Sequence, residues 1–223
     1  MKYFYILILL FLFQPLYSQK HPVFYAGLDL YRHGSFSDNY FGSFNVGAQL
    51  YQLKFFAPEI GYDYLTGSLP EREISKEPPS NLGFPDALFR QGFSSSVLTL
   101  NPKLKFGKDD AFLVISPKYH IGNALSKASY YTSEVNNGTY KRKKYQEVKS
   151  QISFWSFAVG FEGIYISPHF WFGLTLEFTT LDLSNNWNEL DFSEYEVKPD
   201  SPRTNTIGFG FRFYYDPFSL END

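Results

Sequence analysis

The chain has 223 residues, a formal net charge of −3, an aromatic fraction of 21% and no cysteine. The lack of cysteine excludes a disulfide framework, thiolate-bound zinc or iron–sulfur centres and a thiol nucleophile within these residues. The slightly acidic balance argues against nucleic acid as a partner.

Residues 1–18 have the pattern of a secretory signal peptide. Lys2 supplies a short positive start, an apolar run of 11 residues follows over 3–13, and Ser18 is a small residue before an expected cleavage at Gln19. The run is too short to span a membrane as a helix. We therefore expect an exported chain, residues 19–223, that forms one domain. A buried first helix is the alternative interpretation.

After Gln19 the dominant pattern is an alternation with period two, which is typical of strands. The clearest example is 206–215, where bulky apolar residues alternate with Gly208, Gly210 and Arg212; the segment 170–180 repeats the pattern. The apolar faces of the two segments hold Ile207, Phe209, Phe211 and Phe213, and Phe172, Leu174 and Leu176.

Eight such segments are predicted, at 23–33, 42–53, 57–67, 93–106, 111–124, 151–166, 169–182 and 204–215. Each is about as long as a tilted strand needs to be to cross a bilayer. The connections after the second, fourth and sixth segments are tight, whereas 68–92, 125–150 and 183–203 are long and polar. Such asymmetry is typical of a transmembrane barrel with short turns at one end and long loops at the other.

The two faces of the predicted strands differ in chemistry. A closed eight-stranded barrel has a narrow interior that cannot hold all the aromatic side chains, so the apolar faces are expected to meet lipid. The polar faces would then form an ion-paired lumen that contains Asp29, Glu59, Asp63, Lys103, Lys105, Lys118, Glu162, Glu177 and Arg212. The predicted fold is all-β, an eight-stranded antiparallel up-and-down transmembrane β-barrel. A soluble lipocalin-like barrel or sandwich is the alternative.

Two further local patterns give expectations about strand ends and pairing. Aromatic residues border the tight turns, Tyr25, Trp171 and Tyr214 among them, and predict an interfacial girdle. Pro58, Pro102 and Pro117 interrupt predicted strands, so bulges or shifted boundaries are expected there.

Three features carry a resemblance to a known family: the Ser18-Gln19 junction, the eight alternating segments and the closing segment 206–215. The chain resembles the small OmpA/OmpX-type outer-membrane β-barrel proteins of Gram-negative bacteria, and more narrowly those of Bacteroidetes. The resemblance covers residues 19–223 and implies a location in the outer membrane. It departs from the family pattern at 216–223, where a tail follows the closing strand.

The residues of the predicted lumen are expected to have a structural role. His21, His33, His120 and His169 stand at unrelated spacings, so we expect no metal site, and no cofactor is indicated. Ser116 or Ser156 together with His120 would suit an esterase or acyltransferase acting on lipid. Interleaved acids and bases instead favour a plugged lumen without catalytic residues, so we expect no enzyme.

The expected function is a structural or binding role: membrane integrity, surface contact or a subunit of an outer-membrane assembly. A lipid-modifying enzyme and a narrow, porin-like channel are the alternatives. The expected partners are outer-membrane lipids, with lipopolysaccharide among them, and a protein of the same membrane. The basic run Lys141–Lys144 suits contacts to lipopolysaccharide phosphates, or pairing with the acidic segment 183–203; a solvated loop is the third interpretation.

Overall fold

The computed structural model describes residues 18–19, 21–75, 84–108, 111–134, 139–167 and 169–219. The expected signal peptide lies, except for Ser18, outside the described residues. Strands dominate the described chain, and its helical parts are the short α2 (Ser184–Asn188), η1 (Ser37–Asn39) and η2 (Ser193–Tyr195). No helix in these ranges is long and apolar enough to cross a bilayer.

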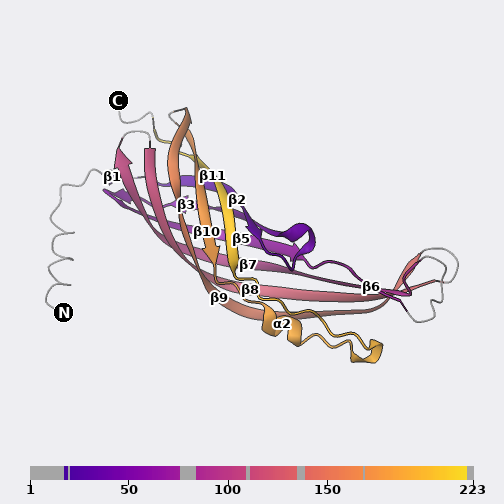
Figure 1. Ribbon diagram of the computed structural model, residues 1–223. Coiled ribbons are helices and arrows are strands. Elements are labelled where there is room, and N and C mark those ends of the chain that lie inside the picture. The colour runs from indigo at the N-terminus through magenta and orange to yellow at the C-terminus, as the bar shows by residue number, and fades with distance from the viewer. Residues whose placement is uncertain are drawn as a thin grey trace.

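Eight strands close into a ring (Figure 1). They are β2 (Val23–Arg32), β3 (Tyr40–Gln49), β5 (Phe56–Ser68), β7 (Ala87–Lys108), β8 (Ala111–Ser133), β9 (Tyr140–Ser167), β10 (Phe170–Thr179) and β11 (Thr206–Tyr215). Each pairs antiparallel with the next one along the chain, and β11 pairs with β2 to close the ring. The predicted eight-stranded antiparallel up-and-down barrel is confirmed.

Three short strands are accessory to this ring. β1 (Ser18–Gln19) pairs with β4 (Gln52–Leu53) at the end that carries the tight turns. β6 (Arg72–Ile74) pairs with the start of β7 at the opposite end.

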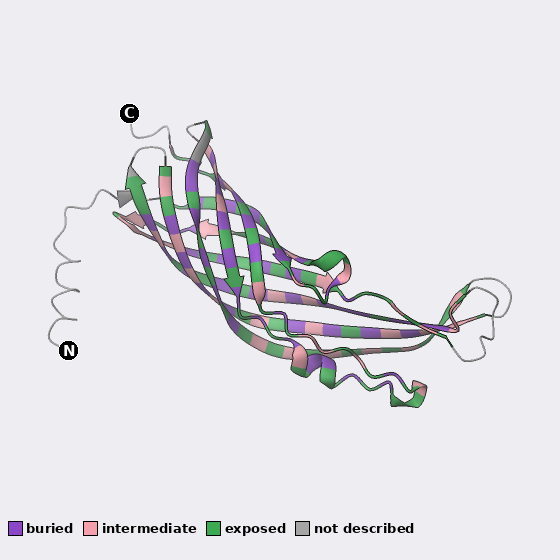
Figure 2. Ribbon diagram, viewed as in Figure 1, coloured by how far each residue is buried: buried purple, intermediate pink, exposed green. Residues whose placement is uncertain are grey.

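The period-two alternation sends successive side chains to opposite faces of the barrel wall. Buried and exposed positions alternate along β2 and β11, and Figure 2 shows the same banding around the ring. The seven residues predicted on the apolar face all point outward and are exposed or half-buried: Phe172, Leu174, Leu176, Ile207, Phe209, Phe211 and Phe213.

The three prolines leave the register of the strand pairing unchanged. Pro58 and Pro102 lie opposite each other between β5 and β7, in unbroken register. Between β7 and β8, residues 101–103 and 116–118 form no cross-strand pairs, yet the same register resumes on either side. The expected bulges or shifted boundaries at these prolines are therefore wrong: the pairs on either side keep the same register, and the strands continue through the prolines instead of ending there.

Strands β7, β8 and β9 have 22, 23 and 28 residues, whereas β2, β3, β10 and β11 have 10 each. Residues 87–91 of β7 therefore extend past their partner strand β5, and residues 140–155 of β9 extend past β10. Together with residues 121–133 of β8 between them they form a sheet that projects from the barrel, here called the projecting sheet (Figure 1). The expectation of long polar loops at 68–92 and 125–150 is wrong where strand pairing continues, which is the case over 87–92, 125–133 and 140–150.

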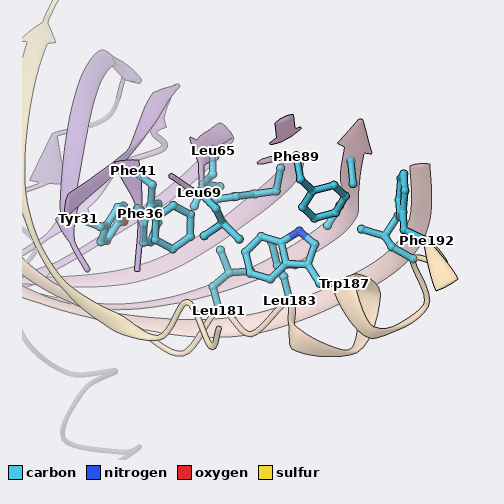
Figure 3. Packing of buried hydrophobic residues seen from close by; sticks show 14 of the residues in the cluster. Tyr31, Phe36, Phe41, Leu65, Leu69, Phe89, Leu181, Leu183, Trp187 and Phe192 are labelled. Carbon is cyan, nitrogen blue, oxygen red and sulfur yellow. The ribbon is translucent and has the colours of Figure 1, made fainter. Parts of the chain in front are cut away.

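The connection between β10 and β11 covers the inner face of the projecting sheet. It buries Leu181, Leu183, Trp187, Leu190 and Phe192 against residues of the sheet and of the barrel mouth. Trp187 lies at the centre of this capping cluster, with its ring 6.2 Å from the ring centroids of Phe36 and of Phe93 (Figure 3). The segment 183–203, expected as a polar loop, instead closes one end of the barrel with apolar side chains.

Candidate functional site

The structure places all nine predicted lumen charges on the inner face of the barrel. Their relative exposures run from 0% to 6%. They lie in two layers, one beside the tight turns and one beside the capping cluster. The turn-side layer comprises Glu59, Lys103, Lys105, Glu162 and Arg212; the cap-side layer comprises Asp29, Asp63, Lys118 and Glu177, with His120.

Glu59 is the centre of the turn-side layer. Its carboxylate accepts hydrogen bonds from Lys103 Nζ, from Arg212 Nη1 at 2.9 Å and from Asn101 Nδ2 at 2.7 Å. Lys103 also donates to Glu162 Oε1 at 2.9 Å, and Lys105 Nζ lies 3.3 Å from Glu162 Oε2. Three bases and two acids thus share one network that joins β5, β7, β9 and β11.

Aromatic rings line this layer. The Arg212 guanidinium lies 4.8 Å from the ring centroid of Tyr25, and Lys103 Nζ lies 4.8 Å from that of Tyr214. The rings of Trp171 and Tyr214 stack at 5.5 Å. Tyr25, Trp171 and Tyr214 therefore point into the lumen, and their expected place in an interfacial girdle is wrong. There they offset the net positive charge of the layer through cation–π contacts.

The cap-side layer is held by separate pairs. Lys118 is ion-paired with Glu177, which also accepts a hydrogen bond from the Tyr31 hydroxyl at 2.9 Å. Asp29 accepts a bond from Asn45 Nδ2 at 2.8 Å. These contacts link strands across the lumen and around the ring, so they brace the barrel wall.

One group in this layer has the geometry of a serine hydrolase triad. Ser156 Oγ lies 3.1 Å from His120 Nε2, and His120 Nδ1 lies 3.2 Å from Asp63 Oδ2. The Thr99 hydroxyl lies 2.8 Å from both Asp63 Oδ2 and His120 Nδ1. Of the two serines considered from the sequence, Ser156 is thus the one that contacts His120.

The surroundings of this triad disfavour an accessible nucleophile. Ser156, His120 and Asp63 are 2–4% exposed, and the His120 ring stacks on Phe154 at 4.4 Å. The capping cluster closes the barrel above them and the turn-side layer lies below. A nucleophile needs space beside it for the reacting carbonyl. The arrangement therefore fits a hydrogen-bonded brace across β5, β7, β8 and β9.

The histidines at the turn-side rim contact the tail that follows β11. His21 Nδ1 lies 3.3 Å from Asp216 Oδ1, and His169 Nδ1 lies 2.8 Å from the backbone oxygen of Asp216. The described part of the tail that follows β11, residues 216–219, thus packs on the barrel rim. Over the described ranges no group of three or more histidine and acidic side chains is placed to hold a metal ion.

The basic and acidic segments at the projecting end meet at one ion pair. Lys144 Nζ lies 2.8 Å from Glu194 Oε1. This contact raises the pKa of Lys144, because the hydrogen bond to the carboxylate favours the charged amine.

No family model and no curated protein matches the chain. Among solved structures it is similar to the N-terminal β-barrel domain of Pseudomonas aeruginosa OprF, with 9% identity over 89% of this chain and 98% of that one, at a TM-score of 0.34. A major outer membrane protein of Thermus thermophilus gives 11% identity over 86% and 99%, at 0.44. Ail, the attachment invasion locus protein of Yersinia pestis, gives 11% over 90% and 96%, at 0.34.

These neighbours include a β-barrel domain and an outer membrane protein. Because the identities are 9–11%, no residue role is carried over from them to this chain. The narrower resemblance to the Bacteroidetes kind stays a prediction.

Proposed function

We propose that the chain is a small outer-membrane β-barrel with a plugged lumen and a structural or binding role. One observation carries the proposal: the apolar faces point outward while the charged faces point inward. A water-soluble barrel has the opposite arrangement, since water solvates charges and excludes apolar side chains.

The outward apolar surface surrounds the whole ring. Phe161, Leu28 and Leu176 are 63%, 60% and 58% exposed, and other strands contribute Phe44, Tyr62, Leu98 and Ile121. Monomeric water-soluble proteins rarely expose continuous apolar patches of more than a few hundred Å². A lipid bilayer would cover this surface without a protein partner.

The limits of the apolar surface fit the thickness of a bilayer. Four of the strands have 10 residues each, near the length of a tilted membrane-spanning strand. On the turn side the rings of Phe170 and Tyr215 stack at 4.8 Å, and on the projecting side those of Tyr119 and Trp155 lie 4.9 Å apart. Aromatic side chains of this kind favour the membrane–water interface.

Beyond the row formed by Ser153, Ile121 and Leu98 the outward face becomes mostly polar. Ser94, Ser96, Lys127 and Lys149 lie there, on strands that carry leucine and isoleucine within the apolar zone. The projecting sheet would therefore stand in water on the outer side of the membrane. Its lysines, and Arg32 on the outward face at the end of β2, suit contact with phosphate groups of lipopolysaccharide.

Impermeant labelling of single cysteines tests the location, because the native chain has no cysteine. Glu189→Cys at the projecting end is expected to react with a charged maleimide on intact cells. Ala111→Cys at a tight turn should react only after the outer membrane is permeabilised. Labelling of both positions on sealed cells, or of neither, would contradict the proposed topology.

The plugged lumen is tested separately by electrical recording. Purified protein in a planar bilayer is expected to give no steady conductance, because two charge layers and the capping cluster fill the barrel. Persistent channels would favour the narrow-channel alternative.

The geometry of Ser156, His120 and Asp63 favours one second candidate function, a serine hydrolase acting on lipid esters. A fluorophosphonate probe distinguishes it from the plugged barrel. The plugged barrel predicts no labelling in detergent or in vesicles. Labelling of the wild-type protein that is lost in Ser156→Ala but kept in Ser116→Ala would establish the hydrolase instead.

A further inference from the structure

A hollow interrupts the bulky apolar side chains on the outward face of the barrel. It lies over Gly42 on β3, whose cross-strand neighbours are Leu30 and Thr66. Its volume of about 570 Å³ is within the range of small-ligand sites. The large side chains around it are Leu28, Leu30, Phe44, Tyr64, Phe209 and Phe211.

The packing of the barrel does not require glycine at the floor of this hollow. A Cβ at Gly42 would meet only the backbone oxygen of Asp29, at an ordinary contact distance of 3.6 Å. A Cβ on the inward-facing Gly47 of the same strand would instead clash with the backbone oxygen of Ile60. Gly47 therefore makes room for the barrel wall itself, whereas Gly42 leaves room for a group outside it.

A cation lies at the outer end of the hollow. Arg32 is exposed on the outward face of β2, two residues beyond Leu30 and so about 7 Å further along the strand. Its cross-strand neighbour Tyr40 is also exposed. Within the described ranges no carboxylate forms an ion pair with Arg32. The guanidinium of arginine matches the geometry of phosphate and binds it through charge-assisted hydrogen bonds.

We propose that the hollow and Arg32 form a binding site for a glycerophospholipid in the outer half of the bilayer. One acyl chain would lie in the hollow over Gly42, and Arg32 would bind the phosphate of the same molecule. The proposal needs a bilayer around the barrel, with the projecting sheet on its outer side, and in that respect rests on the proposed outer-membrane function.

The charge of the surrounding strands favours a lipid with a single phosphate. Arg32 is the only basic residue on the outward faces of β2, β3, β5, β10 and β11, which lie wholly within the described residues. Lipid A carries phosphates at both ends of a disaccharide, together with several acyl chains. The lysines that suit further phosphates, Lys127 and Lys149, lie on β8 and β9, which are adjacent to neither β2 nor β3.

Native mass spectrometry of the detergent-solubilised protein tests the site, with dioleoyl phosphatidic acid as the probe. Dioleoylglycerol has the same acyl chains and lacks the phosphate. We expect the wild-type protein to retain one molecule of phosphatidic acid. Dioleoylglycerol and lipid A should bind at least about tenfold more weakly.

Two variants alter the site, and each has a matched control. Gly42→Leu fills the hollow, whereas Ala48→Leu adds bulk to the outward face of the same strand near the tight turns. Arg32→Gln removes the cation, whereas Arg203→Gln removes another exposed arginine, in the connection before β11. We expect Gly42→Leu and Arg32→Gln to weaken binding at least about fivefold and both controls to leave it unchanged. Unchanged tryptophan emission confirms that each variant is folded.

Wild-type protein that retains no phosphatidic acid, or Gly42→Leu protein that retains it as well as the wild type, would overturn the proposal. Equal losses in Arg32→Gln and Arg203→Gln would overturn it in favour of general charge attraction. Tighter binding of lipid A would overturn the choice of a glycerophospholipid. Wild-type dimers that dissociate in Gly42→Leu would overturn it in favour of a second copy of the chain. Because the assay is done in detergent, its failure leaves the tests of membrane location unaffected.

Discussion

Replacing Glu59 by glutamine is expected to destabilise the barrel more than any other conservative change in the lumen. The Glu59 side chain is fully buried and accepts hydrogen bonds from Lys103, Arg212 and Asn101. Glutamine has nearly the same shape but no charge. Three cations of the turn-side layer would then share the single carboxylate of Glu162.

The magnitude follows from the burial of these charges. Breaking a buried pair by removing one partner costs about 3–5 kcal/mol, because the remaining charge stays desolvated. The glutamine carbonyl can replace one of the accepted hydrogen bonds, but its amide group donates and cannot face a second cation. We therefore expect Glu59→Gln to lower the unfolding free energy by about 3 kcal/mol or more.

Urea unfolding of the protein refolded in lipid vesicles, followed by tryptophan fluorescence, measures this cost. A surface pair supplies the control: Arg203 and Asp182 lie 3.8 Å apart with side chains 78% and 43% exposed. Asp182→Asn should cost less than about 1 kcal/mol. The double variant with Arg212→Met should cost less than the sum of its single changes, because it removes one of the stranded cations.

A cost below about 1 kcal/mol for Glu59→Gln would refute the reasoning, because only a water-filled lumen would screen the stranded cations so well. Equal costs for Glu59→Gln and Asp182→Asn would lead to the same conclusion.

Two further stability predictions use the same unfolding assay. Phe211→Arg, on the outward face within the apolar zone, should cost about 2–4 kcal/mol, whereas Tyr215→Arg near the interface should cost about 1 kcal/mol or less; similar costs at both sites would contradict a bilayer around the barrel. Trp187→Ala should cost about 3–5 kcal/mol, because it empties the centre of the capping cluster, and a cost near zero would mean that this connection does not pack on the barrel.

The side of the wall on which each charge lies was predictable, because alternation with period two is a local property of a strand. Arg212 and Asp29 lie inside for the same reason that Phe211 and Leu28 lie outside. The partner of Arg212 was not predictable in this way. It is Glu59, 153 residues away on a strand that is not adjacent, and only the tilt and stagger of the closed ring bring the two to the same height.

The projecting sheet was not predicted because the residues on its two faces differ little in hydrophobicity. Small inward residues such as Ala124 and Ala128 alternate there with Leu125, Lys127 and Ser129, a pattern also common in loops. The capping cluster did have a signal, since Trp187 and Phe192 stand out in a segment that otherwise reads as acidic and polar. Their packing partners come from β7, β8 and the mouth of the barrel, so local patterns could not identify them.

Fluorescence quenching by lipids brominated in their acyl chains tests the orientation of the barrel wall most directly. Each of the three tryptophans occupies a different environment: Trp155 is 55% exposed on the outward face, Trp171 is buried in the turn-side layer, and Trp187 is buried in the capping cluster. Variants that keep one tryptophan, with phenylalanine at the other two positions, separate the signals. We expect brominated lipid to quench Trp155 much more strongly than Trp171 or Trp187. Quenching of Trp155 by aqueous iodide and not by brominated lipid would contradict a barrel whose apolar face meets the bilayer.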